Sequence, residues 1–561
     1  MYFVPFIFSL DKGMDWENGL FEDYNFWAKY YFYAEACIKH KWPILSHERY
    51  CETLTKLDSN GYKEYLADSV DIYEIKKMPT QKALEKIRKY FIEQKVEDSL
   101  ISNYPSQKDC WIDLLKNESD LFAGILGDIL DRIIKDYKEK PAGLLVYELA
   151  PKALYTVADK RGIPVIFQGG GVIRPPFGRL NHLSLVNGYS AGLVQERYEH
   201  FLTQADKLPI LSRKGLLRLF IDYSYILDIH DVDKTPEYEV GIFNYPHEIA
   251  FKYIFDEYVT DEEMLNRAKK QYQEILTRSK PGYESSQTAK ADFSPTAFHF
   301  CLRCERIVGF ATKGMFEAML ANRIAHEYGS LFFHSLCNEG LEDTSIGVAP
   351  VEYLNFVLFS LCSPFRWHRE PTYLKMLVNG ATEAELYLKS FKEYTKGISA
   401  EDIQFYYMND NRGYRLGTTL YFTKTKKAHE YGAYYCTEGL YLNQGDCTWA
   451  KDKQTSFEFD LEESLDVSLS VSVLLHKVVV STLFTHPRQR IVCEVNGFYC
   501  DSFLVNDKTK RLDFDIPKKA ISSKIALTFK YSFVHYSKNE MPITVAFKKM
   551  KIYKKGTQSP L

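Results

Sequence analysis

The spacing of apolar residues along this chain of 561 residues follows two different patterns, and the pattern changes near residue 400. Before that point, nearly continuous apolar runs at residues 2–9, 143–149 and 164–167 alternate with longer polar segments. Continuous apolar runs are typical of strands that are buried on both faces of a parallel sheet. Their alternation with helical segments predicts a parallel sheet with helices on both faces.

The segments between these runs carry apolar residues at helical spacing. We expect further short strands at residues 43–46, 71–74 and 239–245, and a mostly helical stretch over residues 183–235. The predicted helices cover residues 26–40, 81–94, 120–137, 151–161, 261–278, 351–362, 372–379 and 382–394.

Residues 306–329 form the stretch around which the other elements are organised. The pattern predicts a strand over residues 306–310, a tight turn over 311–314, a helix over 315–321 and a second strand over 323–327. This is a βαβ unit, and it shows that the second part of the chain repeats the strand–helix pattern of the first.

The turn of this unit has the composition of an anion-binding site. Thr312 is the expected N-cap, because its hydroxyl can accept a hydrogen bond from an amide of the first helical turn. Free amides from Gly314 onward and the helix dipole favour an anion, and Lys313 adds a cation. Glu317 lies on the next turn and can accept hydrogen bonds from a sugar or a ribose. The alternative is an ordinary strand-to-helix connection.

A run of three glycines, Gly169-Gly170-Gly171, follows the apolar run 164–167 and precedes Arg174. Glycines at the carboxyl end of a strand let the backbone approach a ligand closely, and ligands bind at that edge of open α/β sheets. The run does not match the G-x-G-x-x-G pattern of dinucleotide-binding sites. A flexible loop without a ligand is the alternative for the glycines, and a structural arginine is the alternative for Arg174.

Three acid–base candidates lie at the ends of predicted strands. Glu148 ends the apolar run 143–149, and His247 and Glu248 follow the predicted strand 239–245. An imidazole or carboxylate so placed can take a proton from a hydroxyl, and Glu248 can orient His247. A pair of surface side chains is the alternative for His247 and Glu248.

From Gly417 onward, polar and apolar residues alternate in short segments, as in a half-buried antiparallel sheet. The predicted strands cover residues 455–461, 465–475, 490–495, 524–531 and 543–552, with a turn at Asn496-Gly497. This pattern predicts a β-sandwich of about 130 residues. Loop residues suited to stacking on a sugar are Tyr434, Tyr435, Asp446 and Trp449, although a purely structural domain fits equally.

Composition narrows the classes of partner. The formal net charge is −3, so no general electrostatic field draws the chain to nucleic acid. The 11 cysteines are scattered, which indicates a reducing compartment, and Cys301 and Cys304 are expected to be buried residues and not zinc ligands. Residues 1–10 predict a buried strand and not a signal peptide. No apolar run of about 18 residues occurs that would span a membrane.

These patterns together predict an α/β fold with two Rossmann-like lobes, followed by an antiparallel β-sandwich. The expected boundaries are residues 1–205 for the N-terminal α/β lobe, 206–415 for the second α/β lobe with its closing helices, and 416–561 for the ancillary β-sandwich.

The first 400 residues resemble the GT-B-type glycosyltransferases of bacterial capsule and surface-polysaccharide assembly. The tail from about residue 430, with Trp449 and a late strand at Met541–Ala546, is similar to the ancillary β-sandwich attached to some of these enzymes. Four segments carry the likeness: Pro5–Ser9; Pro164–Gln168 followed by Gly171 and Arg174; Pro246-His247-Glu248; and Gly309–Ala318. The chain departs from the pattern at Ser279-Lys280-Pro281-Gly282, where the family commonly has a Lys-Glu-His-Pro-like segment after a strand.

The resemblance implies a metal-independent transferase that uses a nucleotide-sugar as co-substrate and needs no other cofactor. It places the donor at Thr312, Lys313, Gly314 and Glu317 of the second lobe. It places the growing glycan at Gly169, Gly170, Gly171 and Arg174 of the first lobe, with Glu148, His247 and Glu248 as the acid–base candidates.

Two other functions remain open at this point. One is a transferase that adds a phosphoryl-type decoration to capsule sugars, and the other is a non-catalytic glycan-binding or scaffold protein of polysaccharide assembly. We expect a cytoplasmic protein. The basic residues 548–555 form either a solvated face or a peripheral contact with the inner membrane or the assembly machinery.

Overall fold

The fold is known from a computed structural model. It describes residues 1–8, 10, 32–48, 80–147, 149–173, 181–186, 191–221, 232, 235–244, 259–279, 289–294, 296–310, 312–329, 337–409, 413–423, 430–440, 447–451, 453–461, 467–480, 488–536, 542–556 and 560–561. The chain divides into two compact units. Unit 1 comprises residues 1–175, 180–208 and 235–393, and unit 2 comprises residues 176–179, 209–234 and 394–561. The three predicted domain boundaries stay predictions.

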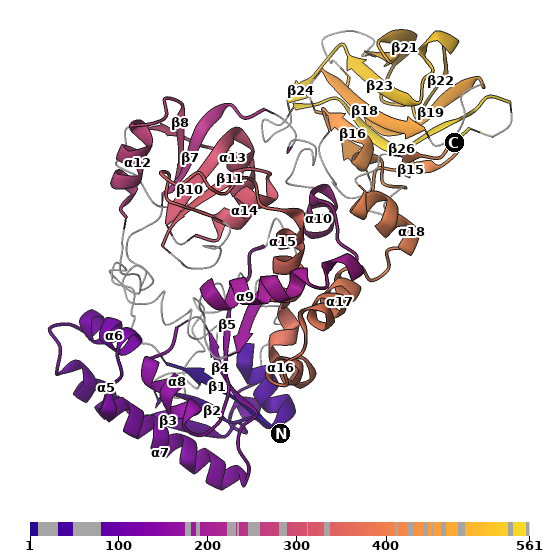
Figure 1. The fold of residues 1–561 in the computed structure, drawn as a ribbon. Helices are drawn as coiled ribbons and strands as arrows, with labels where there is room; N and C mark the ends of the chain where they lie inside the picture. The colour runs from indigo at the N-terminus through magenta and orange to yellow at the C-terminus, as the bar shows by residue number, and fades with distance from the viewer. Residues whose placement is uncertain are drawn as a thin grey trace. The chain divides into compact units, whose positions relative to one another are not determined.

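Unit 1 contains a seven-stranded sheet, here called the first sheet, with strand order β13-β6-β5-β4-β1-β2-β3 (Figure 1). Its strands β1 to β5 are parallel, whereas β6 is antiparallel to both of its neighbours. The strands are β1 Phe3–Ile7, β2 Ile44–His47, β3 Lys89–Ile92, β4 Gly143–Tyr147, β5 Val165–Gly170, β6 Asn181–Val186 and β13 Cys362–Pro364.

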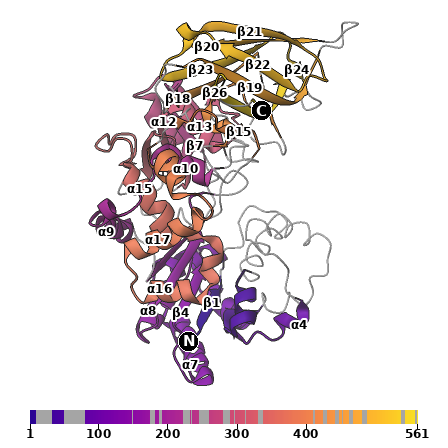
Figure 2. The same ribbon diagram turned by 90° about the vertical axis from the view of Figure 1, so that its right-hand side faces the viewer.

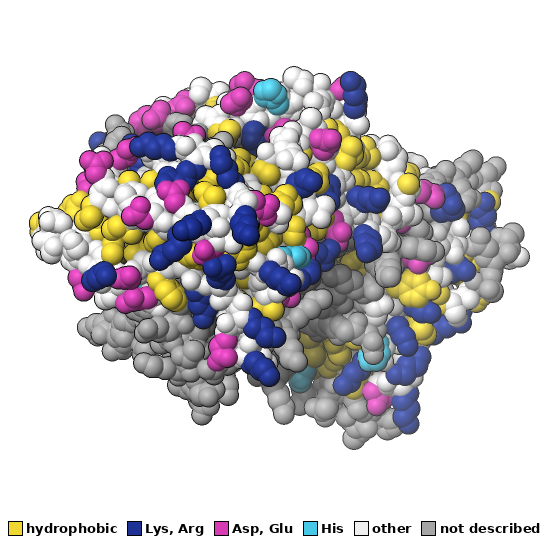
Figure 3. All heavy atoms as spheres, turned by 90° about the horizontal axis from the view of Figure 1, so that it is seen from below, with side chains coloured by type: hydrophobic (Ala, Val, Ile, Leu, Met, Phe, Trp, Pro, Cys, Tyr) yellow, Lys and Arg dark blue, Asp and Glu magenta, His cyan; other side chains and the backbone are white. Residues whose placement is uncertain are grey.

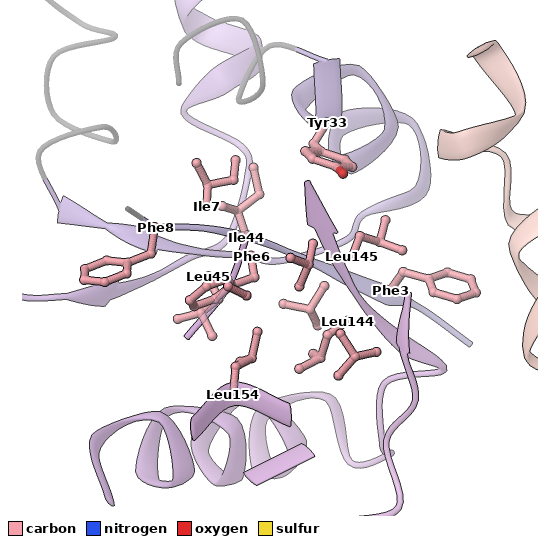
Figure 4. Packing of buried hydrophobic residues seen from close by; sticks show 14 of the residues in the cluster. Phe3, Phe6, Ile7, Phe8, Tyr33, Ile44, Leu45, Leu144, Leu145 and Leu154 are labelled. Atoms are coloured by element: carbon pink, nitrogen blue, oxygen red, sulfur yellow. The ribbon is translucent and has the colours of Figure 1, made fainter. Parts of the chain in front are cut away.

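The apolar runs read from the sequence form the centre of this sheet. All five residues of β1 are buried. Figure 4 shows side chains of β1, β2 and β4 between Leu154 on one face and Tyr33 on the other. Leu154 belongs to α8 Lys152–Asp159, and Tyr33 belongs to the helical residues 32–40. Helices therefore cover both faces, as the sequence predicted.

A second sheet of unit 1 has the order β12-β11-β10-β7-β8-β9, and all of its strands are parallel. The predicted βαβ unit lies in it as β10, α14 and β11. The strands are β7 Tyr238–Asn244, β8 Ile275–Ser279, β9 Lys290–Ala291, β10 Cys304–Phe310, β11 Ile324–Tyr328 and β12 Asn338–Glu339.

The helices of unit 1 agree with most of the predicted ranges. They are α4 Gln81–Leu84, α5 Gln94–Ile101, α6 Gln107–Lys116, α7 Asp120–Tyr137, α8, α9 Ala191–Leu202, α12 Asp261–Lys269, α13 Ala297–Arg303, α14 Gly314–Leu320, α15 Val351–Phe356, α16 Pro371–Val378 and α17 Glu383–Tyr394. A π-helix, Val357–Leu361, continues α15, and a 3-10 helix covers Phe365–Arg369. No helix of the described residues is long and apolar enough to cross a membrane.

After α15 the chain returns to the first sheet. β13 pairs with β6, where Cys362 lies opposite Leu183. The ring of Phe365 stacks on Phe32 at 4.5 Å, and Gln168 Nε2 donates to the carbonyl of His368 at 2.8 Å. The closing segment is therefore part of the core of the first sheet, although it follows the second sheet in the chain.

Two segments of the α/β region were predicted wrongly. The expected helix 81–94 is broken by strand β3, in which Tyr90 and Ile92 are buried on alternate positions. The expected helix 261–278 ends with α12, and β8 follows it. In both cases a short alternation of two or three apolar residues also fitted a helical period, and pairing with a neighbouring strand decided the outcome. The stretch 183–235 begins inside strand β6, but its described residues are mostly helical, as predicted, with α9, a 3-10 helix Ala205–Lys207 and α10 Arg213–Phe220.

Unit 2 contains two sheets, as predicted for the C-terminal region (Figure 2). The first has the order β14-β18-β23-β20-β21 with β16 beside β18, and the second has the order β15-β26-β19-β22 with β17 beside β26. All of these pairs are antiparallel except the short β14–β18 pair. Phe457 and Phe529 of the first sheet contact Phe547 of the second at 5.7 and 5.5 Å, so the apolar faces of the two sheets pack together.

The strands of unit 2 are β14 Gly413–Tyr414, β15 Thr419–Tyr421, β16 Cys436–Glu438, β17 Thr448–Trp449, β18 Gln454–Leu461, β19 Leu469–Val478, β20 Gln489–Val495, β21 Phe498–Val505, β22 Arg511–Ile516, β23 Lys524–Tyr531 and β26 Val545–Lys554, with a separate hairpin of β24 His535–Tyr536 and β25 Pro542–Ile543. Its helices are α10 Arg213–Phe220, α18 Ala400–Asp402, the π-helix Ile403–Met408 and the 3-10 helices Gly432–Tyr435 and Lys518–Ala520.

Two of the residues predicted to stack on a sugar, Tyr435 and Trp449, lie in the described part of unit 2. Tyr435 is 1% exposed, and its hydroxyl shares a hydrogen bond with Tyr406, so it belongs to the core of unit 2. Trp449 lies in β17, which pairs with β26. Asp446 and the side chain of Tyr434 lie outside the described residues. The basic stretch 548–555 is largely the second half of β26, a strand that pairs on both sides.

Charged side chains of both signs are interspersed over the face of the molecule in Figure 3. This mixture agrees with the small formal net charge of −3.

Candidate functional site

The turn after β10 differs from the prediction in its N-cap and in its amides, which are not free. The N-cap of the helix is Lys313, which makes no side-chain cap hydrogen bond, and Thr312 precedes it with its Oγ1 accepting from Gly314 N at 3.2 Å. Met315 N donates to the carbonyl of Thr312 at 3.2 Å, and Phe316 N donates to the carbonyl of Lys313 at 3.1 Å. The premise of free amides at the start of the helix was therefore wrong, because the turn satisfies these three within itself. Any attraction for an anion comes from the Lys313 ammonium.

Lys313 reaches from the second sheet to the first. Its Nζ donates to the carbonyl of Gly170 at 2.5 Å, across 143 positions of sequence. A Cβ on Gly170 would lie 2.9 Å from this Nζ, which is closer than the two atoms can approach. A glycine at position 170 therefore lets the lysine reach the backbone.

The predicted glycine loop is part of a strand. β5 extends to Gly170, and Gly169 and Gly170 pair with Leu183 and His182 of β6. The alternative of a flexible loop is wrong for these two glycines, because the ladder with β6 holds them. Only Gly171 lies beyond the strand, still buried.

A crevice surrounds the contact between Lys313 and Gly170. It is small, with a cavity volume of about 10 Å³, which is room for about one water molecule. Its lining residues are Gly170, Gly171, Val172, Leu183, Lys313, Leu361 and Cys362. Among these seven described residues, Lys313 is the one with an ionised side chain, and the others present apolar groups, backbone and a thiol.

The thiol of Cys362 is not a nucleophile at neutral pH. Burial raises its pKa to about 12, against the opposing effects of a hydrogen bond from the Val172 amide and the charge of Lys313. The thiolate is the reactive form of cysteine, and it is absent far below the pKa. Cys362 therefore acts as an apolar wall of the crevice.

Glu317 lies apart from this crevice. Its side chain is half-buried. Burial is the main reason that the pKa of the Cys301 thiol on α13 is raised, and the nearby carboxylate of Glu317 raises it further. Glu317 therefore faces α13, and its predicted contact with a ribose stays a prediction. Cys301 and Cys304 are both free buried thiols, as expected.

Four predicted site residues lie outside the described residues. They are Glu148, Arg174, His247 and Glu248. Their roles stay predictions. Of the predicted site residues, Lys313 meets Gly170, and these two line the crevice together with Gly171.

The carboxyl edge of the second sheet holds polar residues that the sequence patterns did not single out. Asn244, the last residue of β7, is 1% exposed, and its Oδ1 has no hydrogen-bond partner among the residues that the structure describes. Its Nδ2 lies 3.5 Å from Ser279 Oγ, at the end of β8. The signal in the sequence was a polar residue that ends an apolar run, Val240–Asn244. Because β8 was predicted as part of a helix, the sequence did not show that Asn244 and Ser279 lie side by side at the ends of two neighbouring strands.

Known proteins give little further constraint. No protein-family model and no curated protein matches the chain. Among solved structures, the KpsC beta Kdo 2,7 transferase of Thermosulfurimonas dismutans matches 42% of this chain and 81% of its own, with 12% identity and a TM-score of 0.29. UDP-GlcNAc 2-epimerase from Neisseria meningitidis bound to UDP-GlcNAc matches 70% of this chain and 100% of its own, with 9% identity and a TM-score of 0.21.

Scores at this level carry no argument about fold or function. The assignment of an α/β fold with parallel sheets rests instead on the strand pairings of this chain.

Replacing Gly314 with alanine is expected to destabilise unit 1. The added Cβ would lie 2.7 Å from Cε2 of Phe243, whose ring is held against Phe300 at 4.9 Å. Overpacking of this kind costs about 1–3 kcal/mol. Thermal unfolding measures the effect. Gly124→Ala in α7 is the control, because nothing lies within 4 Å of its added Cβ, and alanine there should stabilise the helix by about 0.5–1 kcal/mol. Equal stability of the two variants would contradict the packing described for Gly314.

Proposed function

We propose that this protein is a glycosyltransferase that moves a sugar from a nucleotide-activated donor to a growing surface polysaccharide. The hydrogen bond from Lys313 Nζ to the carbonyl of Gly170 carries the proposal. It joins the turn that follows β10 to the last residue of β5. Both are carboxyl ends of strands in parallel α/β sheets, where such sheets bind their ligands.

Two ligands bound at these edges would meet. A donor on the second sheet and an acceptor on the first sheet would approach each other at the crevice around Lys313. The return of β13 to the first sheet supports a two-lobed arrangement of the GT-B type, because the segment after the second sheet closes the core of the first. The resemblance of the sequence to capsule glycosyltransferases points to the same class.

The proposed reaction is a displacement at the anomeric carbon. The acceptor hydroxyl oxygen forms a bond to that carbon, and the bond from the carbon to the donor phosphate breaks. The hydroxyl proton passes to a base, for which Glu148 and His247 are the candidates. The leaving phosphate takes the electron pair of the broken bond, and the Lys313 ammonium stabilises its growing charge without a metal ion.

Donor binding is proposed to change the partner of Lys313. The carbonyl of Gly170 is neutral, whereas a phosphate carries negative charge and adds a Coulomb attraction to the hydrogen bond from the ammonium. The lysine would therefore exchange the carbonyl of Gly170 for the donor phosphate. This exchange would open the end of β5 to the acceptor.

The test is a binding and transfer assay on the full chain. UDP-, GDP- and CMP-linked sugars are titrated by calorimetry, and transfer to surface-polysaccharide fragments is followed by mass spectrometry. The proposal expects one class of donor to bind and to extend a fragment by one sugar. Binding of the glycan without any nucleotide binding would overturn it in favour of a glycan-binding scaffold. Transfer of a phosphoryl group in place of a sugar would overturn it in favour of the decorating transferase.

A further inference from the structure

Phe293 is a large apolar residue whose side chain is exposed to solvent. Its side chain is 91% exposed, which is the largest exposure among the described large hydrophobic residues. It comes two residues after β9, at the carboxyl edge of the second sheet. An aromatic ring left in solvent forgoes the stabilisation that burial would provide, so its position needs another explanation.

The backbone on both sides of Phe293 is anchored. The carboxylate of Asp292 is fully buried, and it accepts from Arg278 Nη1 at 2.6 Å and from Arg303 Nη1 at 2.9 Å. Ser294 donates to the same carboxylate from its hydroxyl at 2.6 Å, and its carbonyl accepts from Arg278 Nη1 at 2.8 Å. The two neighbours of the exposed ring are therefore held in place by hydrogen bonds and ion pairs.

Phe293 continues a row of strand ends. In the β8–β9 register Thr277 lies opposite Ala291, and the amide of Asp292 donates to the carbonyl of Thr277 at 2.7 Å. Phe293 therefore lies next to the end of β8. The end of β8 lies beside Asn244 on β7, whose Oδ1 is buried without a partner.

We propose that Phe293 stacks on the base of a nucleoside diphosphate, whose polar groups Asn244 helps to bind. This inference rests on the proposed function, which places the donor phosphates at the turn after β10. An aromatic face binds any base by stacking, and a buried unpartnered amide oxygen is an acceptor for a base amine or a ribose hydroxyl.

The spacing of the strands favours a diphosphate over a monophosphate. The order β10-β7-β8-β9 puts three strand spacings, about 14 Å, between the turn after β10 and the end of β9. This distance is of the order of an extended nucleoside diphosphate, and a nucleoside monophosphate is too short to reach both ends. A diphosphate-linked sugar is thus the class of donor.

The test compares ligands on the full chain by calorimetry. The probes are UDP, GDP, CMP and inorganic pyrophosphate. UDP or GDP should bind the wild-type protein more tightly than CMP. Phe293→Ala and Phe293→Leu should each weaken that binding by about 10-fold, because leucine keeps the apolar character and removes the ring face. Phe293→Trp should retain it, and pyrophosphate should bind all variants equally.

Phe498→Ala is the matched control, since Phe498 is an exposed phenylalanine on β21 of unit 2, and it should bind as the wild type does. Unchanged nucleotide binding by Phe293→Ala would overturn the inference and leave the proposed function standing. An equal loss of pyrophosphate binding, or tighter binding of CMP than of UDP and GDP, would also overturn it. A wild-type protein that binds no nucleotide would overturn both proposals before any variant is compared.

Discussion

Replacing Lys313 with methionine is expected to lower the rate constant of sugar transfer, kcat, by about 10²–10³-fold, the cost of removing one charge-stabilising group from a transition state. Methionine keeps the length and the apolar stem of the side chain and removes the ammonium. Lys313 is the ionised residue among those that line the crevice, so no neighbour in that lining replaces its charge. Steady-state transfer kinetics with the donor found by titration measure the effect.

Two further variants separate the role of the charge from that of the fold. Lys313→Arg keeps the charge with another shape and should retain more activity than Lys313→Met, although the two basic residues are not equivalent. Lys392→Met on α17 removes an exposed lysine and should leave kcat unchanged. Transfer at the wild-type rate by Lys313→Met would place the donor phosphates elsewhere.

Replacing Asp292 with alanine is expected to destabilise the edge of the second sheet by about 3 kcal/mol or more, because the loss of one partner leaves buried charge without compensation. The Arg278 side chain is 16% exposed and the Asp292 side chain 0%, so water cannot replace the lost carboxylate. Hydrogen exchange of the amides of β8 measures the free energy of local opening.

Asp131→Ala is the matched control for this prediction. Asp131 also accepts two hydrogen bonds from an arginine, Arg161, at 2.8 and 2.7 Å. Its side chain is 61% exposed, however, and exposed pairs contribute about 0–1 kcal/mol. An equal loss of stability in the two variants would contradict the prediction, because it would mean that burial does not increase the contribution of the Asp292 ion pairs to stability.

The sequence predicted the elements with strong local signals. The run of five buried residues in β1 was recognised from continuous apolar character, and α7 was placed residue for residue over 120–137. The turn between β20 and β21 was recognised from Asn496-Gly497, which have φ angles of 51° and 78°. Asparagine and glycine tolerate these positive values, so this hairpin turn is encoded locally.

The prediction failed where the apolar residues of a short segment fit both the helical and the strand spacing. The residues of β3 and β8 fit a helix as well as a strand when they are read alone. A neighbouring strand, β2 for β3 and β7 for β8, supplies the hydrogen bonds that decide between them. The missed β8 also hid the row of strand ends that holds Asn244 and Ser279.

By itself, the sequence determined that the chain has two regions of α/β pattern and a β-rich C-terminal part, and that a lysine follows the strand of a βαβ unit. Those features depend on neighbours a few residues apart, which composition and periodicity record. Only the tertiary structure decided that Lys313 donates to Gly170, that the glycines lie in a strand and that the turn has used its own amides. The first of these facts joins residues 143 positions apart, which the packing of the two sheets brings together. The other two depend on the pairing of β5 with β6 and on the backbone geometry of the turn, which periodicity does not record.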